Sequence, residues 1–226
     1  MGYFSPELFT FLRQLKRNND RDWFNKNKER YIEEVQQPAL DFVASVAPGL
    51  RKISPNFIAD PRPVGGSMFR IYRDTRFSKD KTPYKTHVGI SFGHRSRKDV
   101  HSPGFYLHLE PGEVFLGAGI WHPDSKSATA IRQAIVDKSA AWKKAAHAAA
   151  FTKSFRLSSE SLARAPRGFD PDHPLVDDLR RKDFIAIREL DEKTATSARF
   201  LDTFLGSCRE AAPLMRFLCD ALGVAY

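Results

Sequence analysis

Two segments that alternate between apolar and polar residues, Phe105–Glu110 and Glu113–Ile120, are separated only by Pro111-Gly112. Alternation with a period of two is typical of half-buried strands, and Pro-Gly between two such runs is a turn signal. The chain is therefore expected to form an antiparallel hairpin here, and any fold of this protein must contain that hairpin.

The hairpin has two unlike faces in the register that places Glu110 opposite Glu113. One face is aliphatic and holds the pairs Leu109–Val114 and Leu107–Leu116, whereas the other holds His108–Phe115 and Tyr106–Gly117. A bulge at the turn would shift this register by one residue. Glycine on the second face leaves room for a ligand or for a closely packed helix.

The remaining pattern predicts one α+β domain. Further strands are expected over Met68–Tyr72, Thr86–Phe92 and Phe184–Leu190. Helices are expected after Ser5-Pro6-Glu7 and Asn18-Asn19-Asp20, from Ser125, over Ala140–Ala150, and from Thr194 to the end of the chain. Pro38 should kink or divide the second helix, Ala47-Pro48-Gly49 should end it, and Pro213 should bend the last helix. We expect a single domain over residues 1–226, in which a mainly antiparallel sheet of about five strands packs with N-terminal and C-terminal helices.

The composition describes a basic, folded protein. The 226 residues include 36 Lys and Arg against 27 Asp and Glu, a formal charge of +9. Such a charge favours nucleic acid, phosphorylated metabolites or anionic surfaces as partners, although many basic proteins bind none of them.

Membrane and secretion signals are not found in the sequence. No apolar run approaches the roughly 18 residues of a membrane span, and Met1–Glu7 lacks the pattern of a signal peptide. Cys208 and Cys219 fall on one predicted helix about 16 Å apart, at ~1.5 Å per residue, which is too far for a disulfide. We therefore expect a cytoplasmic protein with no membrane partner; its oligomeric state is left open.

The stretch Arg70–Lys85, called the basic block below, contains six cationic and two anionic residues, with three aromatic residues among them. Aromatic anchors indicate that the block is held in the fold while it presents cations to an anion. The candidate ligand-binding residues are Arg70, Arg73, Asp74, Arg76, Lys79, Lys81, Tyr84 and Lys85, with Tyr106 from the hairpin. In the alternative interpretation, Asp74 and Asp80 form ion pairs that only hold the loop.

Histidines are the next candidates for chemistry. If the strands pair as predicted, His87 and His108 point from the same face of the sheet, and His122 follows the hairpin. An acid–base pair or a metal site needs such convergence, which spacing alone does not supply, and a structural histidine is the more common case. The carboxylates that could join them are Asp74, Asp80, Glu110 and Asp124.

Short catalytic motifs do not occur in this sequence: it has no phosphate-binding loop, dinucleotide fingerprint, His-Glu-x-x-His motif or cysteine pair at zinc spacing. The two cysteines fall on a buried stripe and are expected to pack in the core. The sequence therefore predicts no cofactor and no metal site, and it leaves open whether the protein is an enzyme.

Several segments together resemble a known family. They are Asn18–Phe24, the whole basic block, Gly104–Pro111, Gly117–Trp121 and Pro166-Arg167-Gly168-Phe169. This pattern resembles the conserved hypothetical family DUF2461 over nearly the whole chain. The resemblance implies a single soluble domain, common in bacteria, and transfers no catalytic residue.

Three functions follow as hypotheses. The first is binding of a phosphate-bearing or other anionic ligand through the basic block. The second is an enzyme acting on a phosphorylated substrate, with His87 or His108 as the acid–base group and arginines stabilising the transition state. The third is nucleic-acid binding without sequence specificity. A basic block that serves only as internal scaffolding is the remaining alternative.

Overall fold

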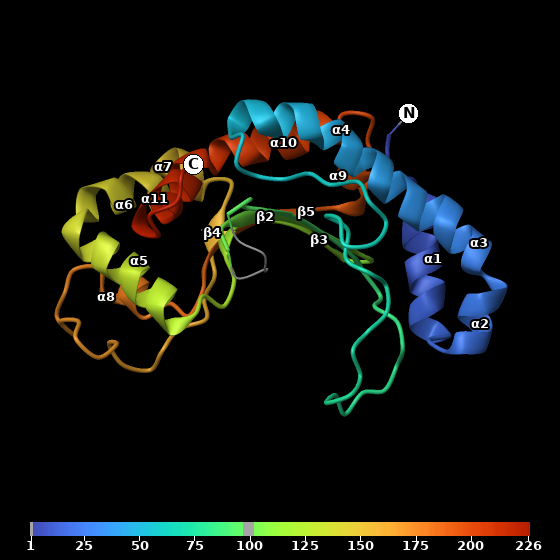
Figure 1. The fold of residues 1–226 in the computed structure, drawn as a ribbon, viewed down its shortest axis with the longest axis horizontal. Coiled ribbons are helices and arrows are strands. Elements are labelled where there is room, and N and C mark those ends of the chain that lie inside the picture. The colour runs from blue at the N-terminus through green and yellow to red at the C-terminus, as the bar shows by residue number, and fades with distance from the viewer. Residues whose placement is uncertain (1, 97–101) are drawn as a thin grey trace.

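A five-stranded antiparallel sheet organises the part of the chain that the structure describes (Figure 1). The structure is a computed structural model and describes residues 2–96 and 102–226. The strands are β1 (Val88–Gly93), β2 (Gly104–Glu110), β3 (Glu113–Ile120), β4 (Arg156–Leu157) and β5 (Phe184–Leu190), in the spatial order β1-β2-β3-β5-β4. This arrangement confirms the predicted α+β fold. The predicted loop between β1 and β2 lies in part outside the described residues.

The hairpin has the predicted register. Glu110 pairs with Glu113, His108 with Phe115 and Tyr106 with Gly117. Gly112 has a φ of 83°, which glycine adopts readily, so the turn closes without a bulge. The prediction for β5 is also confirmed, with the same bounds.

One face of the sheet is covered by helices. Its buried side chains include Ile90 and Phe92 of β1 and Leu107 of β2. The helices over this face are α1 (Pro6–Arg17), α4 (Gln37–Ile53), α10 (Phe200–Glu210) and α11 (Ala212–Ala221). Phe92 packs against Phe204 of α10, with ring centroids 5.2 Å apart. The core therefore lies between this face and the N- and C-terminal helices, as predicted.

Further helices flank the two ends of the sheet (Figure 1). At one end lie α2 (Arg21–Lys26), α3 (Lys28–Tyr31) and a π-helical turn (Ile32–Gln36). At the other lie α5 (Ser125–Asp137), α6 (Ser139–Ala146), α7 (Ala149–Thr152) and α8 (Val176–Leu179). A last short helix, α9 (Glu192–Ala195), follows β5. No helix in the described ranges is both long and apolar enough to cross a membrane.

The strand predicted over Met68–Tyr72 does not form. Residues 67–69 run along the edge of β1, where the Phe69 N–H donates to the Gly89 carbonyl and the Ser91 N–H donates to the Ser67 carbonyl. The chain then leaves the sheet, because the basic block pairs with itself through the Tyr72–Tyr84 bridge. The strand predicted from Thr86 begins at Val88, so His87 lies just before it.

Pro48 acts differently from the prediction, whereas Pro38 divides its helix as expected. Pro48 does not end α4, which continues to Ile53 with this proline inside it. A Cβ atom on Gly49 would overlap the side chain of Leu205 in α10, so this glycine allows the two helices to approach closely. Pro38 lies in the first turn of α4, directly after the π-helical turn, and marks a boundary between segments. The C-terminal helix begins at Phe200 rather than Thr194, and it is interrupted before Pro213.

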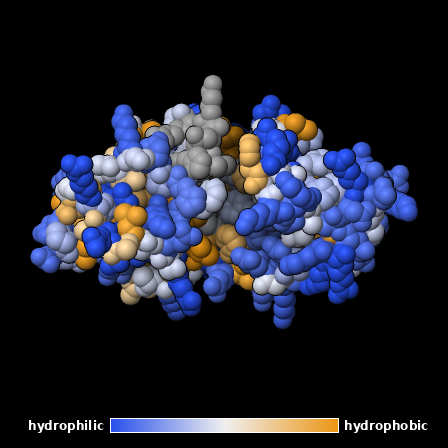
Figure 2. Space-filling model, turned by 90° about the horizontal axis from the view of Figure 1, so that it is seen from below, coloured by the Kyte–Doolittle hydropathy of each residue, from blue (hydrophilic) through white to orange (hydrophobic). Residues whose placement is uncertain are grey.

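The second face of the sheet is turned away from α4 and α10. Viewed from this side, the molecule has a hollow between its two raised halves (Figure 2). The segment between α4 and β1 (teal in Figure 1) extends from one end of the sheet on this side. This open face carries the mixed set of side chains predicted from the hairpin.

Candidate functional site

Three side chains that could carry chemistry meet where β1 begins and β2 ends. His108 lies opposite Gly89, and the Val88–Leu109 pair places His87 and Glu110 at adjoining ends of their strands. The rings of His87 and His108 are 4.5 Å apart between centroids. One carboxylate oxygen of Glu110, Oε2, lies 3.9 Å from His87 Nδ1 and 3.5 Å from His108 Nε2. Alternation along the strands therefore brings these three groups together; they are called the His–His–Glu cluster below.

Tyr106 and Phe115 fix the ring of His108. The Tyr106 hydroxyl lies 3.1 Å from His108 Nδ1, and the Phe115 ring stacks on the imidazole at 4.7 Å. A Cβ atom on Gly89 would lie 2.6 Å from the Tyr106 hydroxyl, so only glycine leaves space for this contact. His108 is 8% exposed, and its Nε2 atom has no hydrogen-bond partner among the described residues.

The second carboxylate oxygen of Glu110 is held from outside the cluster. Oε1 accepts a hydrogen bond from the Thr86 hydroxyl at 3.0 Å and lies 3.4 Å from the Lys16 ammonium of α1. Burial alone would raise the pKa of Glu110, but the Thr86 hydrogen bond and the Lys16 charge bring it below its ordinary value. Glu110 is thus a carboxylate whose Oε2 faces the two imidazoles.

Both histidines are held in the neutral form. Burial lowers the pKa of His87 to about 4, and the neighbouring His108 adds to the effect. Burial also lowers the pKa of His108, although Glu110 opposes that shift. At neutral pH the cluster therefore combines two uncharged imidazoles with one carboxylate.

The acidic residues of the basic block pair with arginines. Arg73 Nη1 lies 2.5 Å from Asp80 Oδ2, and Arg76 Nη2 lies 2.7 Å from Asp74 Oδ2. The Arg76 hydrogen bond lowers the pKa of Asp74 to about 2. These contacts are the ion pairs of the scaffolding interpretation, and they partly neutralise two of the six cations.

Two other residues of the block also serve the fold. Lys81 donates to the Thr75 carbonyl at 2.9 Å. Tyr84 is buried, stacks on Phe24 at 4.1 Å, and exchanges backbone hydrogen bonds with the side chain of Asn19. Tyr84 therefore anchors the block to α2.

Lys85 and Arg70 remain as neighbouring cations. The Lys85 ammonium donates to the Arg70 carbonyl at 2.9 Å and lies over the Phe69 ring. Burial, followed by the charge of Arg70, lowers the pKa of Lys85. Among the described residues, no carboxylate lies within ion-pair distance of either side chain. Lys85 also acts electrostatically on His87, so Lys85 borders the His–His–Glu cluster.

His122 lies apart from the other two histidines. It follows β3 at the end of the sheet opposite Glu110, and its Nδ1 atom lies 2.8 Å from Asp183. The Asp183 carboxylate also accepts the backbone N–H of His122 at 2.6 Å, which holds the residue at a φ of 45°. Of the three predicted histidines, the structure brings together only His87 and His108.

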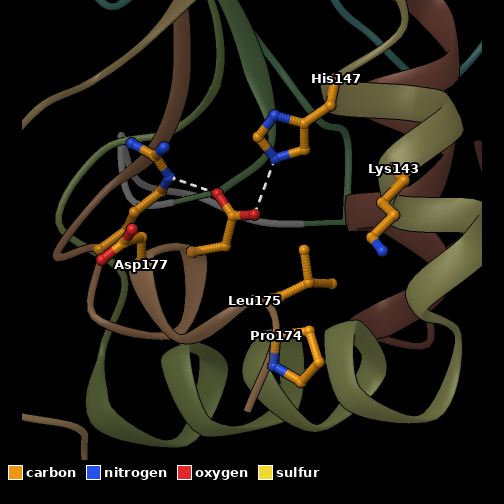
Figure 3. Close-up of a pocket in the computed structure, with 7 residues that line it drawn as sticks. Lys143, His147, Pro174, Leu175 and Asp177 are labelled. Carbon is orange, nitrogen blue, oxygen red and sulfur yellow. Dashed lines mark hydrogen bonds and ion pairs between the residues drawn. The ribbon is translucent and has the colours of Figure 1, made fainter. Parts of the chain in front are cut away.

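A separate buried carboxylate, Asp178, lines a cavity between α6 and α8 (Figure 3). Its Oδ2 accepts hydrogen bonds from Trp142 Nε1 at 2.8 Å and His147 Nε2 at 2.7 Å, and its Oδ1 accepts from Arg181 Nε at 2.9 Å. Three side chains of the protein itself thus hydrogen-bond to the Asp178 carboxylate, so we interpret this carboxylate as structural. The sequence contains no signal for it, because its four residues are scattered between positions 142 and 181.

Two residues of the site were not foreseen, Thr86 and Lys16. Lys16 lies on the first helix, and only helix packing brings it to Glu110.

A family model described as a conserved hypothetical protein, DUF2461, matches residues 7–217. No curated protein and no solved structure matches the chain. The match spans nearly the whole sequence, including the basic block and the hairpin, and the chain therefore belongs to the DUF2461 family.

Proposed function

We propose that the protein binds a small anionic ligand, with a phosphate or carboxylate group, at the open face of the sheet where Lys85 and Arg70 border the His–His–Glu cluster. The observation that carries this proposal is the pair of adjacent cations, for which the described residues provide no carboxylate. The proposal narrows the predicted anion site from the whole basic block to two of its residues.

Electrostatics supports an anion at this position. Two like charges held close together repel each other, and the repulsion grows where burial lowers the local dielectric. Asp74 and Asp80 form their ion pairs with Arg76 and Arg73; Asp74 also acts electrostatically on Arg70, but neither carboxylate forms an ion pair with Arg70 or Lys85. A bound phosphate or carboxylate would relieve it and gain charge-assisted hydrogen bonds from both side chains.

The ligand is tested by measuring thermal stability at low salt with inorganic phosphate, sugar phosphates, nucleotides, dicarboxylates and a single-stranded oligonucleotide. We expect a small anion to raise Tm, and Lys85→Met and Arg70→Met to abolish the increase. Lys79→Met is the matched control, because Lys79 is an exposed lysine of the same block.

Two results would contradict this proposal. The first is a wild-type Tm that no anion raises at low salt. The second is an equal loss of binding in all three variants, which would indicate nonspecific attraction to the net charge of +9. If only the oligonucleotide raises Tm, with an effect that falls steeply with salt, nucleic-acid binding replaces the proposal.

A second candidate function is acid–base catalysis on the bound anion. The contact between the rings of His87 and His108 is the observation in its favour. A panel of phosphate and carboxylate esters tests it: His87→Gln should abolish turnover while leaving the Tm increase by the anion in place. Equal turnover in wild type and His87→Gln would remove this candidate.

We also propose a location for the protein in the cell, the cytoplasm. The two cysteines, Cys208 and Cys219, are buried free thiols. We expect a cytoplasmic protein, which fractionation of cells expressing the tagged chain would check.

A further inference from the structure

We propose that His87, His108 and Glu110 bind a divalent first-row transition-metal ion, with Zn²⁺ as the reference ion. This inference reverses the expectation from sequence that the protein has no metal site. It stands whether or not the anion proposal is correct, because it concerns different atoms and is tested with metal alone.

The spacing of the donor atoms fits a metal ion. One donor atom from each residue lies within 4.8 Å of the other two. A tetrahedral ion about 2.1 Å from each donor places the donors about 3.4 Å apart. The distances from Glu110 Oε2 to His108 Nε2 and His87 Nδ1 are 3.5 and 3.9 Å, so a small rotation of His87 completes the site. Of the three side chains, that of His87 is the most exposed, at 29% against 11% for His108 and 16% for Glu110.

The environment of the His108 Nε2 atom also supports a metal site in the cluster. This buried atom makes no hydrogen bond of normal geometry among the described residues, although Glu110 Oε2 lies 3.5 Å away, and a buried polar atom without a close partner is destabilising. If His108 Nδ1 carries the proton and donates it to the Tyr106 oxygen, Nε2 presents a lone pair toward Glu110 Oε2. A metal ion between these two atoms would satisfy both.

The outer contacts resemble those that support metal ligands in general. Metal-binding histidines usually hydrogen-bond through their other ring nitrogen, and metal-binding carboxylates are themselves hydrogen-bonded. Tyr106 provides the first contact, and Thr86 provides the second through Glu110 Oε1. Phe115 closes the apolar side of His108 by stacking on it. His108 and Glu110 are thus oriented before any ion binds, and a rotation of His87 completes the site.

The donor set selects the class of metal. Two imidazoles and one carboxylate suit Zn²⁺, Fe²⁺, Co²⁺ or Ni²⁺, whereas Mg²⁺ and Ca²⁺ prefer oxygen ligands. Three protein ligands leave at least one coordination position for water or a ligand. Lys85 lies on the same side and repels a cation, so it should weaken metal binding while it favours an anion.

Metal-free protein, prepared with a chelator, is titrated with Co²⁺ and then with Zn²⁺, with d–d absorption and calorimetry as readouts. We expect a Co²⁺ band that Zn²⁺ displaces and excess Mg²⁺ does not. His108→Gln and Glu110→Gln should weaken binding by more than the roughly 10–100-fold effect of losing an outer contact, and Tyr106→Phe should fall within that range.

Two control variants separate this site from other histidines and from the anion site. His122→Asn removes a surface histidine outside the cluster and should leave Co²⁺ affinity unchanged. Lys85→Met should keep or tighten Co²⁺ binding, although it should abolish binding of the anion to metal-free protein. The two proposals can therefore fail separately.

The metal proposal is overturned if wild type gives no Co²⁺ band, or if His108→Gln and Glu110→Gln bind Co²⁺ as tightly as wild type. An equal loss in His122→Asn would also overturn it. Should the ligand variants fail to fold, X-ray absorption of cobalt-loaded wild type decides, because the proposal requires two imidazole ligands.

Discussion

At the scale of single residues, small side chains and satisfied charges determine what the open face can do. Gly89 leaves the space that the Tyr106 hydroxyl occupies beside His108. Alternation along the strand by itself places the Tyr106 and His108 side chains on this face. It did not predict that a glycine on the neighbouring strand sets their contact, because that contact depends on the distance between strands.

We predict that Gly89→Ala displaces Tyr106, because the added Cβ atom would lie 2.6 Å from its hydroxyl. Loss of the contact with His108 should lower the free energy of unfolding by about 1 kcal/mol. Gly93→Ala is the control, since a Cβ atom there meets nothing within 4 Å. Urea denaturation measures both variants, and equal stabilities would contradict the prediction.

Asp178 gives a prediction for the dependence of stability on pH. Burial by itself raises the pKa of this carboxyl, but hydrogen bonds from Trp142, Arg181 and His147 lower it below the ordinary value. Because the folded-state pKa lies below the unfolded one, the stabilisation is fully present above about pH 4 and is lost as pH falls through the folded-state pKa.

Asp178→Asn should therefore lower the free energy of unfolding at pH 7 by about 3 kcal/mol, since it leaves Arg181 without its charged partner. The difference from wild type should shrink between pH 5 and pH 3, which urea denaturation across that range measures. Asp177→Asn, at an exposed position in α8, should match wild type throughout. A difference for Asp178→Asn that is independent of pH would contradict this assignment.

At the scale of elements, strand pairing follows local pattern more closely than helix ends do. The β2–β3 register and the bounds of β5 agree with the prediction because alternation and turn chemistry act over a few residues. The end of α4 does not agree, because packing of Gly49 against Leu205 in α10 keeps the helix intact past Pro48. Tertiary contacts therefore override a local breaker there.

The pairing of β3 with β5 depends on Gly119, which has a φ of 140°. A Cβ atom at this position would overlap the Phe184 carbonyl, and most residues are strained in this conformation. We predict that Gly119→Ala lowers the free energy of unfolding by about 2–4 kcal/mol. Gly206→Ala in α10 should instead raise it by up to about 1 kcal/mol, because its Cβ is free and alanine favours helix. Thermal denaturation that ranks the two variants in the opposite order would contradict this account.

At the scale of the whole molecule, one hydrophobic core connects the helices at both ends of the sheet. Phe11 and Phe24 near the N-terminus and Trp142 and Phe217 toward the C-terminus belong to the same buried cluster. This continuity supports the expectation of a single domain over residues 1–226.

A single domain predicts one unfolding transition. Trp23 lies in α2 and Trp142 in α6, at opposite ends of the sheet (Figure 1). For each of the variants Trp23→Phe and Trp142→Phe, urea unfolding is followed by tryptophan fluorescence and by circular dichroism. In each variant the two signals should give the same urea midpoint, because both ends of the molecule unfold together. Separate midpoints for fluorescence and circular dichroism would indicate two folding units.

The sequence by itself determined the hairpin, the two faces of the sheet, and the presence of Tyr106, His87 and His108 on one of those faces. Period-two alternation and turn chemistry are local, so they can be read without the fold. The tertiary structure alone decided which groups meet that face: Lys16 arrives from α1, and the aspartates of the basic block pair with Arg73 and Arg76. These contacts join residues that are distant in sequence or that have several possible partners, and packing chooses among them.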